Sequence, residues 1–347
     1  MQFTSIDPAT DPLWASLLTS YKSNLFHSPP WIKTLQRTYE LDIRAYVLRE
    51  QGGAPVAGTT YCHVEDMTGA RILGMPFSDY CDPLVADRQH WSLLSDQLLS
   101  SGEPVAIRCL YNDLPLSDER FRLANRAKWH GVDLAADADQ LWQQVDESSR
   151  RAIRKARSQG VVVRPAETKE ELRRFFELHL KVRKYKYRLL AQPYSLFEHL
   201  WEQFVEQGQG FLMVAMHEQC IIGGIYFLGW GDTIYYKFNA SDSARLAYRP
   251  NDLLVWESML YAKELGYSML DFGLSDWDQE GLLRYKRKFA TDERTIYLLR
   301  SDSAVAPSPG ALKARSLLPQ LTNLFTEPSV PDSITEQAGA LLYRNFC

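Results

Sequence analysis

Apolar and polar positions follow a similar order in two blocks, one in each half of the chain. Residues 45–65 (AYVLREQGGAPVAGTTYCHVE) and 211–232 (FLMVAMHEQCIIGGIYFLGWGD) each predict two strands joined by a turn. Gly58 and Gly223 occupy matching places in these blocks, 165 residues apart. An amphipathic helical pattern, a glycine and a short apolar strand follow each block. We interpret the chain as a tandem duplication of one α/β unit.

Helical periodicity and capping signals predict further elements in the second half. A capping box at Thr168 opens a helix over 169–188, and a proline precedes a second helix over 251–265. A basic helix is expected over 149–159, between the two halves. The Pro/Ser-rich stretch 303–331 predicts a surface tail, and residues 334–346 predict a docking helix.

Composition narrows the class of protein. The 347 residues favour two domains, and 45% hydrophobic with 24% charged residues excludes general disorder. No apolar run approaches the ~20 residues of a transmembrane segment, and the acidic, polar start is unlike a signal peptide. We therefore expect a cytoplasmic protein. Five scattered cysteines and seven histidines without paired spacing argue against a metal site.

The net charge of −4 conceals a strongly basic segment. Residues 150–188 hold fourteen Lys or Arg and only four Asp or Glu. Arg151, Arg154 and Lys155 lie three or four residues apart, so they share one face of the basic helix. This face is a candidate for binding a polyanion. The alternative is a solvated helix face with Ile153 buried beneath it.

Several longer motifs resemble one family along nearly the whole chain. They are SPPWIKTLQRTY, MPFSDY, RRAIRKARSQGVVV, YRPNDLLVWESMLYAKELGYSMLDFGLS and GLLRYKRKFA. These motifs resemble the FemAB/FemX-like peptidyltransferases, whose chains are tandem GNAT-fold acyltransferases. The resemblance implies an α/β (α+β) chain with two GNAT-like domains, each a mixed, largely antiparallel sheet flanked by helices. We expect an acceptor-side domain at 1–147, a catalytic, donor-side domain at 148–302 and a tail at 303–347.

The resemblance also implies a reaction and its participants. An aminoacyl or acyl group would pass to an amine acceptor, such as a peptidoglycan precursor or a peptide, in cell-envelope or peptide-type metabolite synthesis. The donor would be aminoacyl-tRNA. Acyl-CoA is the second candidate donor, and the protein would then be an N-acyltransferase linked to exopolysaccharide synthesis. No cofactor would be tightly bound. Peripheral contact with a membrane, but no transmembrane segment, would fit this role. A non-catalytic GNAT-like scaffold is the alternative of another class.

One departure from the family pattern weakens the coenzyme A alternative. The segment ARLAYRPND precedes the helix of the second half where GNAT enzymes carry a glycine-containing pyrophosphate loop. Without those glycines, close approach of a pyrophosphate to backbone N–H groups is less assured. By resemblance, Arg249 and Asn251 of this segment are candidate substrate-binding residues.

The candidate catalytic groups cluster near the end of the second half. Lys286 matches the lysine of the family's FK-type motif, and it would neutralise a donor phosphate or the leaving group; the alternative is a solvated lysine. Tyr285 lines the same pocket or belongs to the core. Asp271 and Ser275 stand at the C-terminal end of a predicted central strand, where Asp271 acts as a base or caps Gly273.

Two further groups complete the predicted site. Tyr236, Lys237 and Asn239 lie on the strand that splays in GNAT folds, and simple alternation places Tyr236 on the face opposite the other two. In the first half, Asp79 and Tyr80 resemble the family's acceptor-binding turn. Asp79 would orient or deprotonate the amine; the alternative is an aspartate that satisfies its own turn.

Overall fold

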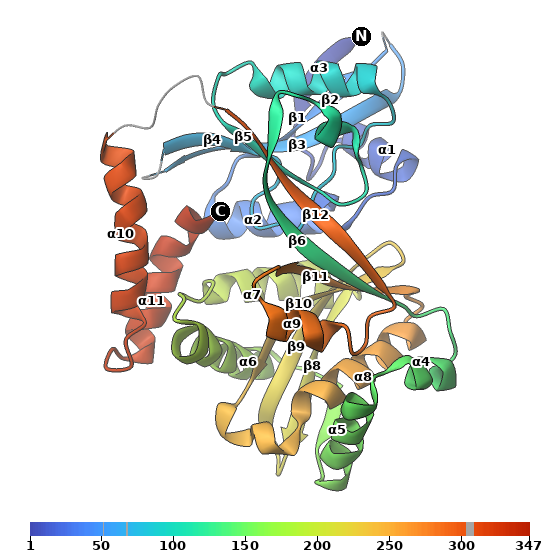
Figure 1. Cartoon of the computed structure of the whole chain (residues 1–347), viewed down its shortest axis with the longest axis vertical. Coiled ribbons are helices and arrows are strands. Elements are labelled where there is room, and N and C mark those ends of the chain that lie inside the picture. The colour runs from blue at the N-terminus through green and yellow to red at the C-terminus, as the bar shows by residue number, and fades with distance from the viewer. Residues whose placement is uncertain (51, 67–68, 303–308) are drawn as a thin grey trace. The chain divides into compact units, whose positions relative to one another are not determined.

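The computed structural model describes residues 1–50, 52–66, 69–302 and 309–347, and they form two compact units (Figure 1). Unit 1 consists of Met1–Lys128, Arg294–Leu318 and Cys347, and unit 2 consists of Trp129–Glu293 and Pro319–Phe346. The chain passes from one unit to the other within β6 (Phe121–Asp133) and again within β12 (Asp292–Ser301). The sequence predicted the division at 147/148, at the basic helix between the two halves.

Unit 1 is a mixed sheet with three main helices. Its strand order is β1-β2-β3-β4-β5-β12-β6. Besides β6 and β12, its elements are β1 (Gln2–Ile6), α1 (Pro12–Ser20), α2 (Pro29–Tyr39), β2 (Ile43–Arg49), β3 (Pro55–Asp66), β4 (Gly69–Leu73), α3 (Arg88–Leu99) and β5 (Val105–Cys109). Helix α2 begins at the two prolines, with the Ser28 side chain accepting from the Trp31 N–H as its N-cap.

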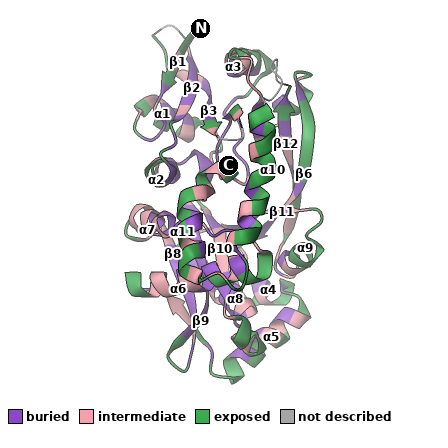
Figure 2. Ribbon diagram, turned by 90° about the vertical axis from the view of Figure 1, so that its left-hand side faces the viewer, coloured by how far each residue is buried: buried purple, intermediate pink, exposed green. Residues whose placement is uncertain are grey.

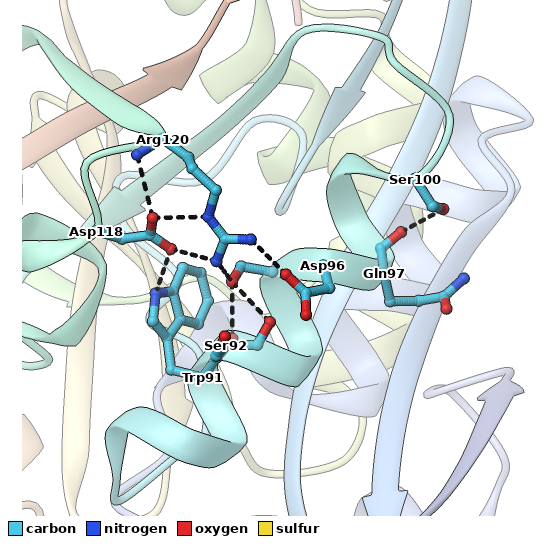
Figure 3. A network of polar contacts seen from close by, with 8 residues as sticks. Trp91, Ser92, Asp96, Gln97, Ser100, Asp118 and Arg120 are labelled. Carbon is cyan, nitrogen blue, oxygen red and sulfur yellow. Dashed lines mark hydrogen bonds and ion pairs between the residues drawn. The ribbon is translucent and has the colours of Figure 1, made fainter.

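A polar network fastens α3 to the beginning of β6 in unit 1 (Figure 3). Arg120 donates to Asp118 at 2.8 Å and also contacts Asp96, while the indole N–H of Trp91 donates to Asp118 at 3.0 Å. The hydrogen bonds to Arg120 outweigh burial and hold the pKa of Asp118 below its usual value. Because these groups satisfy one another at the surface, we regard the network as structural.

Unit 2 is built in the same way around its own run of mixed strands. Its strand order is β6-β11-β10-β9-β8-β7. Its elements are α4 (Ala138–Gln144), α5 (Glu147–Ser158), β7 (Val162–Pro165), α6 (Lys169–Lys181), α7 (Tyr194–Leu200), β8 (Gly210–His217), β9 (Cys220–Trp230), β10 (Thr233–Ser241), α8 (Pro250–Glu264), β11 (Met269–Asp276) and α9 (Glu280–Lys286). Figure 2 shows buried residues along most of β8 and β9, as their near-continuous apolar runs require.

The two units repeat one order of elements, as the sequence predicted. The antiparallel pair β2–β3 corresponds to β8–β9, and the parallel pair β4–β5 corresponds to β10–β11. The glycines that follow α3 and α8, Gly102 and Gly266, both adopt positive φ angles, 72° and 90°. Strand β4 stops at Leu73, and a turn follows it.

The C-terminal region differs in part from the prediction. Helix α10 (Pro309–Phe325) occupies most of the stretch expected to be a tail, because its leucines recur at helical spacing despite Pro319. Residues 303–308 lie outside the described residues. Helix α11 (Asp332–Leu342) forms where a docking helix was expected, and Glu336 pairs with Arg173 of α6 at 2.7 Å. No described helix is long and apolar enough to cross a membrane.

Candidate functional site

The central strands of unit 2 pair over only part of their length. Strands β10 and β11 are joined by three residue pairs, the last of them Tyr235 with Asp271. Beyond this pair β10 continues to Ser241 alongside β9, and β11 continues to Asp276. The two strands therefore separate, and we call the region beyond Tyr235 and Asp271 the splay. Backbone groups along this edge of β10 are not used by the β10–β11 ladder.

A β-bulge at Lys237 changes the faces that were predicted for β10. Tyr236 pairs with Phe227 and Phe238 pairs with Tyr226, so Lys237 is the extra residue. Alternation therefore restarts after it, and the Asn239 amide donates to the Tyr236 hydroxyl at 2.6 Å. The prediction that Tyr236 and Asn239 face opposite sides was wrong, because simple alternation does not hold across a bulge.

Strand β11 carries a kink beside the splay. Gly273 has a φ of 66°, a conformation that costs little only for glycine. The carboxylate of Asp271 is 1% exposed and accepts a hydrogen bond from the Gly273 N–H at 2.5 Å. Asp271 thus caps the kink. Ser275 is fully buried, and its hydroxyl has no hydrogen-bond partner among the described residues.

Lys286 lies inside unit 2 and is not a solvated surface lysine. It is the last residue of α9 and is 3% exposed. Its ammonium group donates to the carbonyl oxygens of Gly273 and Leu274 at 3.1 and 3.0 Å. A positive charge is therefore held against the kink of β11. Burying an ammonium group costs free energy, so a buried lysine at this position indicates a functional role for its charge.

Two half-buried tyrosines, Tyr285 beside Lys286 in sequence and Tyr236 of β10, complete the candidate site. Burial raises the pKa of Tyr285 well above its usual value, and its hydroxyl is without a partner within the described part of the chain. Burial also raises the pKa of Tyr236, and the hydrogen bond from Asn239 offsets only part of that effect. Both phenols therefore stay protonated at neutral pH and can act as hydrogen-bond donors.

The beginning of α8 is attached to the end of β10. The Ser241 hydroxyl donates to the Asn251 side-chain oxygen at 2.5 Å. Arg249 precedes the helix with a φ of 59°, in the left-handed region that glycine usually occupies. Asn251 thus has a structural contact, whereas the exposed Arg249 side chain lies at the N-terminus of a 15-residue helix, where an anion is favoured.

Sequence reasoning missed a buried histidine within electrostatic reach of Lys286. His130 of β6 is completely buried, its Nε2 lies 3.0 Å from Glu293, and Glu293 also accepts from Arg287 at 2.7 Å. Burial, and then the charge of Lys286, lower the pKa of His130. The contact joins residues 163 positions apart, so no local motif could have revealed it.

In unit 1, the predicted acceptor turn is organised by a different aspartate. Asp82 accepts from the backbone N–H groups of three consecutive residues, Leu110 to Asn112, each at 2.9 Å. Asp79 is partly exposed, whereas the Tyr80 ring is 1% exposed and packs edge-on against Phe26. The roles of Asp79 and Tyr80 in binding an acceptor stay predictions.

The basic segment separates into two parts. On α5, Arg151, Arg154 and Lys155 are exposed on one side, with Arg151 paired to Glu147 and Arg154 lying over the Trp142 ring. Most of the later bases are engaged within unit 2, by acids or by backbone carbonyls. These residues are Arg164, Lys169, Arg173, Arg174, Arg183, Lys184 and Arg188. The α5 face therefore stays the candidate polyanion-binding surface that the sequence predicted.

Comparison with known proteins gives a family model and a fold. Residues 143–287 match the model of the acetyltransferase (GNAT) domain. Comparison with curated protein sequences gives no significant match. Among solved structures, FemX is similar with a TM-score of 0.61 and 14% identity, over 86% of this chain and 97% of FemX.

Two further structures share the fold. A tandem GNAT protein from the clavulanic acid biosynthesis pathway aligns with a TM-score of 0.55 and 12% identity, over 88% of this chain and all of that chain. The C-terminal domain of a putative lysylphosphatidylglycerol synthetase from Agrobacterium fabrum aligns with a TM-score of 0.54 and 13% identity, over 89% and 94%.

These findings confirm the predicted tandem-GNAT fold, its likeness to FemX and the acyltransferase class. The match to the domain model includes the splay and ends one residue beyond Lys286. Residues 143–287 are therefore similar to an acetyltransferase (GNAT) domain, and the chain has a tandem-GNAT fold like that of FemX.

Proposed function

We propose that this protein transfers an aminoacyl group from aminoacyl-tRNA to an amine and forms an amide at the splay of unit 2. The observation that supports this most directly is the end of the β10–β11 ladder beside a buried, fixed cation, Lys286. Acyl-CoA is the second candidate donor. Both donors are cytoplasmic, so the proposal places the reaction in the cytoplasm.

The proposed reaction needs an oxyanion to be stabilised, a leaving group to be neutralised and an amine to be oriented or deprotonated. The amine nitrogen attacks the ester carbonyl carbon, the carbon–oxygen bond to the tRNA ribose breaks, the amine loses a proton and the ribose hydroxyl gains one. Backbone N–H groups along the open edge of β10 can stabilise the oxyanion. Lys286 favours negative charge on the departing oxygen. Asp271 holds the Gly273 kink in place. On the family resemblance alone, Asp79 of unit 1 is our candidate for orienting or deprotonating the amine.

The choice of donor rests on charge and backbone shape. The α5 face offers exposed bases for phosphates. A pyrophosphate loop rich in glycine is missing before α8, where Arg249 takes the left-handed conformation. The acceptor is an amine-bearing molecule of cell-envelope or peptide-type metabolite synthesis, such as a peptidoglycan precursor or a peptide. An acceptor anchored in lipid would bring the protein into peripheral contact with a membrane.

Incubation of the purified protein with total charged tRNA or an acyl-CoA mixture, together with amine acceptors, tests the proposal. We expect loss of the aminoacyl group that is abolished by prior ribonuclease treatment. Ribonuclease-resistant consumption of acyl-CoA would show that the second donor is the true one. If neither donor loses its acyl group, the chain is a non-catalytic scaffold.

Replacing Arg151, Arg154 and Lys155 with glutamine is expected to weaken tRNA binding and reduce its dependence on salt. Each phosphate that a base neutralises releases condensed counterions, so the slope of log affinity against log salt should fall by about one for each phosphate that the variant no longer neutralises. A filter-binding titration at several salt concentrations measures this slope.

A charge-matched triple variant provides the control for this titration. Arg122, Arg126 and Lys313 are exposed bases of unit 1, and their replacement with glutamine removes the same charge. The slope of this control should stay close to that of the natural protein. Equal slopes for both variants would mean that the α5 bases are only a solvated face.

A further inference from the structure

An exposed aromatic segment follows α6. The helix continues into a π-helical turn, Val182–Tyr187, which ends at Arg188 with a φ of 55°. Tyr185 and Tyr187 are 50% and 52% exposed, and Lys186 between them is also exposed. Short π-helical segments are rare and are found often at functional sites. Large aromatic side chains at the surface of this turn therefore call for an explanation.

Hydrogen bonds to the segment 326–332 hold the turn in place. Lys184 is completely buried and donates to Asp332 at 2.8 Å and to the Val330 carbonyl. The Tyr185 hydroxyl donates to the same carboxylate at 2.8 Å. The Arg188 guanidinium donates to the Thr326 carbonyl. These contacts fix the backbone, so the exposed rings are presented on a firm support, which lowers the entropic cost of binding.

Charge and position add to this arrangement. The Lys184 ammonium lies 4.9 Å from the centre of the Tyr185 ring, and the Lys186 ammonium lies 4.9 Å from the centre of the Tyr187 ring. Exposed rings with adjacent cations favour ligands that combine an aromatic base with phosphate. The ring of His179 in α6 contacts the ring of Phe238 in β10, so the helix that leads into the turn packs against a strand that borders the splay.

We propose that Tyr187 and Lys186 form a platform that stacks the phosphorylated adenosine of the acyl donor. This inference rests on the proposed function, because both candidate donors carry such a group. It is the 3′-terminal adenosine in aminoacyl-tRNA and the 3′-phosphoadenosine in coenzyme A.

Binding measurements with Tyr187 variants test the platform without turnover. The probes are uncharged total tRNA, the same tRNA trimmed of its 3′-terminal adenosine, coenzyme A, and 4′-phosphopantetheine, which lacks the adenosine. We expect Tyr187→Ala to weaken binding of the true donor's intact probe at least about fivefold, the lower end of base–aromatic stacking. Binding of the matching truncated probe should not change, and Tyr187→Phe should keep the affinity of the natural protein.

Control measurements separate the possible outcomes. Phe346→Ala removes another exposed ring of unit 2, 41% exposed, and should leave all four affinities unchanged. If Tyr187→Ala leaves both intact probes unaffected, the platform is refuted, whether or not transfer occurs. The platform is also refuted if Tyr187→Ala weakens binding to phosphatidylglycerol vesicles but leaves binding of tRNA and coenzyme A unchanged. If Tyr187 controls binding but neither donor supports transfer, the platform stands and the proposed function fails.

Discussion

Replacing Lys286 with methionine is expected to lower the rate of transfer at least about 100-fold. A preorganised charge at a developing oxyanion or leaving group is typically worth about 3–4 kcal/mol of activation free energy. Methionine keeps the length of the side chain and removes the charge. The measurement is the initial rate of amide formation, divided by the concentration of folded protein, with the donor that loses its acyl group in the incubation with charged tRNA or acyl-CoA.

The structure adds a stability effect to this prediction. The Gly273 and Leu274 carbonyls accept from the buried ammonium, and removing a partner of a buried polar group costs about 1–3 kcal/mol. The variant should therefore unfold at a lower denaturant concentration and still be folded in buffer. Arg284→Met, at an exposed position of the same helix, is the matched control and should retain both rate and stability. A folded Lys286→Met protein with the natural rate would remove Lys286 from the mechanism.

The second expected result is loss of stability in mild acid. His27 in unit 1 and His179 in unit 2 are buried, and desolvation lowers the pKa of each to about 4 from the usual 6.5. A histidine with a lowered folded pKa binds protons more weakly in the folded than in the unfolded state. The contribution of the neutral, buried histidine to the free energy of unfolding is therefore complete above pH 6.5. This contribution is lost as the pH falls from 6.5 toward 4.

This effect is large enough to measure in each unit. Below pH 6.5 each histidine should reduce the free energy of unfolding by about 1.4 kcal/mol per pH unit, about 2 kcal/mol at pH 5. Urea unfolding at pH 7.5, 6 and 5 measures the change. His179→Gln keeps an amide in reach of Gln192 and removes the titrating group, so unit 2 should become less sensitive to pH. Equal unfolding free energies at pH 7.5 and 5 in the natural protein would contradict the prediction.

The sequence alone determined the duplicated architecture. Periodicity, helix starts and the matching glycines of the two blocks are local or regularly repeated signals. They predicted the hairpins, α6, α8 and the short apolar strands that follow the helices. Lys286, Asp271 and Asn239 could also be singled out, because their motifs resemble a family. These features can be read from the sequence because each depends on residues that are close together in the chain.

The tertiary structure decided how those residues act. Whether Lys286 is solvated or buried depends on where α9 packs against β11, and no local pattern contains that information. The bulge at Lys237 reversed the expected faces of β10. The basic segment has most of its charge engaged by partners far along the chain, such as Asp332, 148 residues after Lys184. Such pairings form only when the helices pack, because packing, and not local propensity, brings distant charges within hydrogen-bond distance.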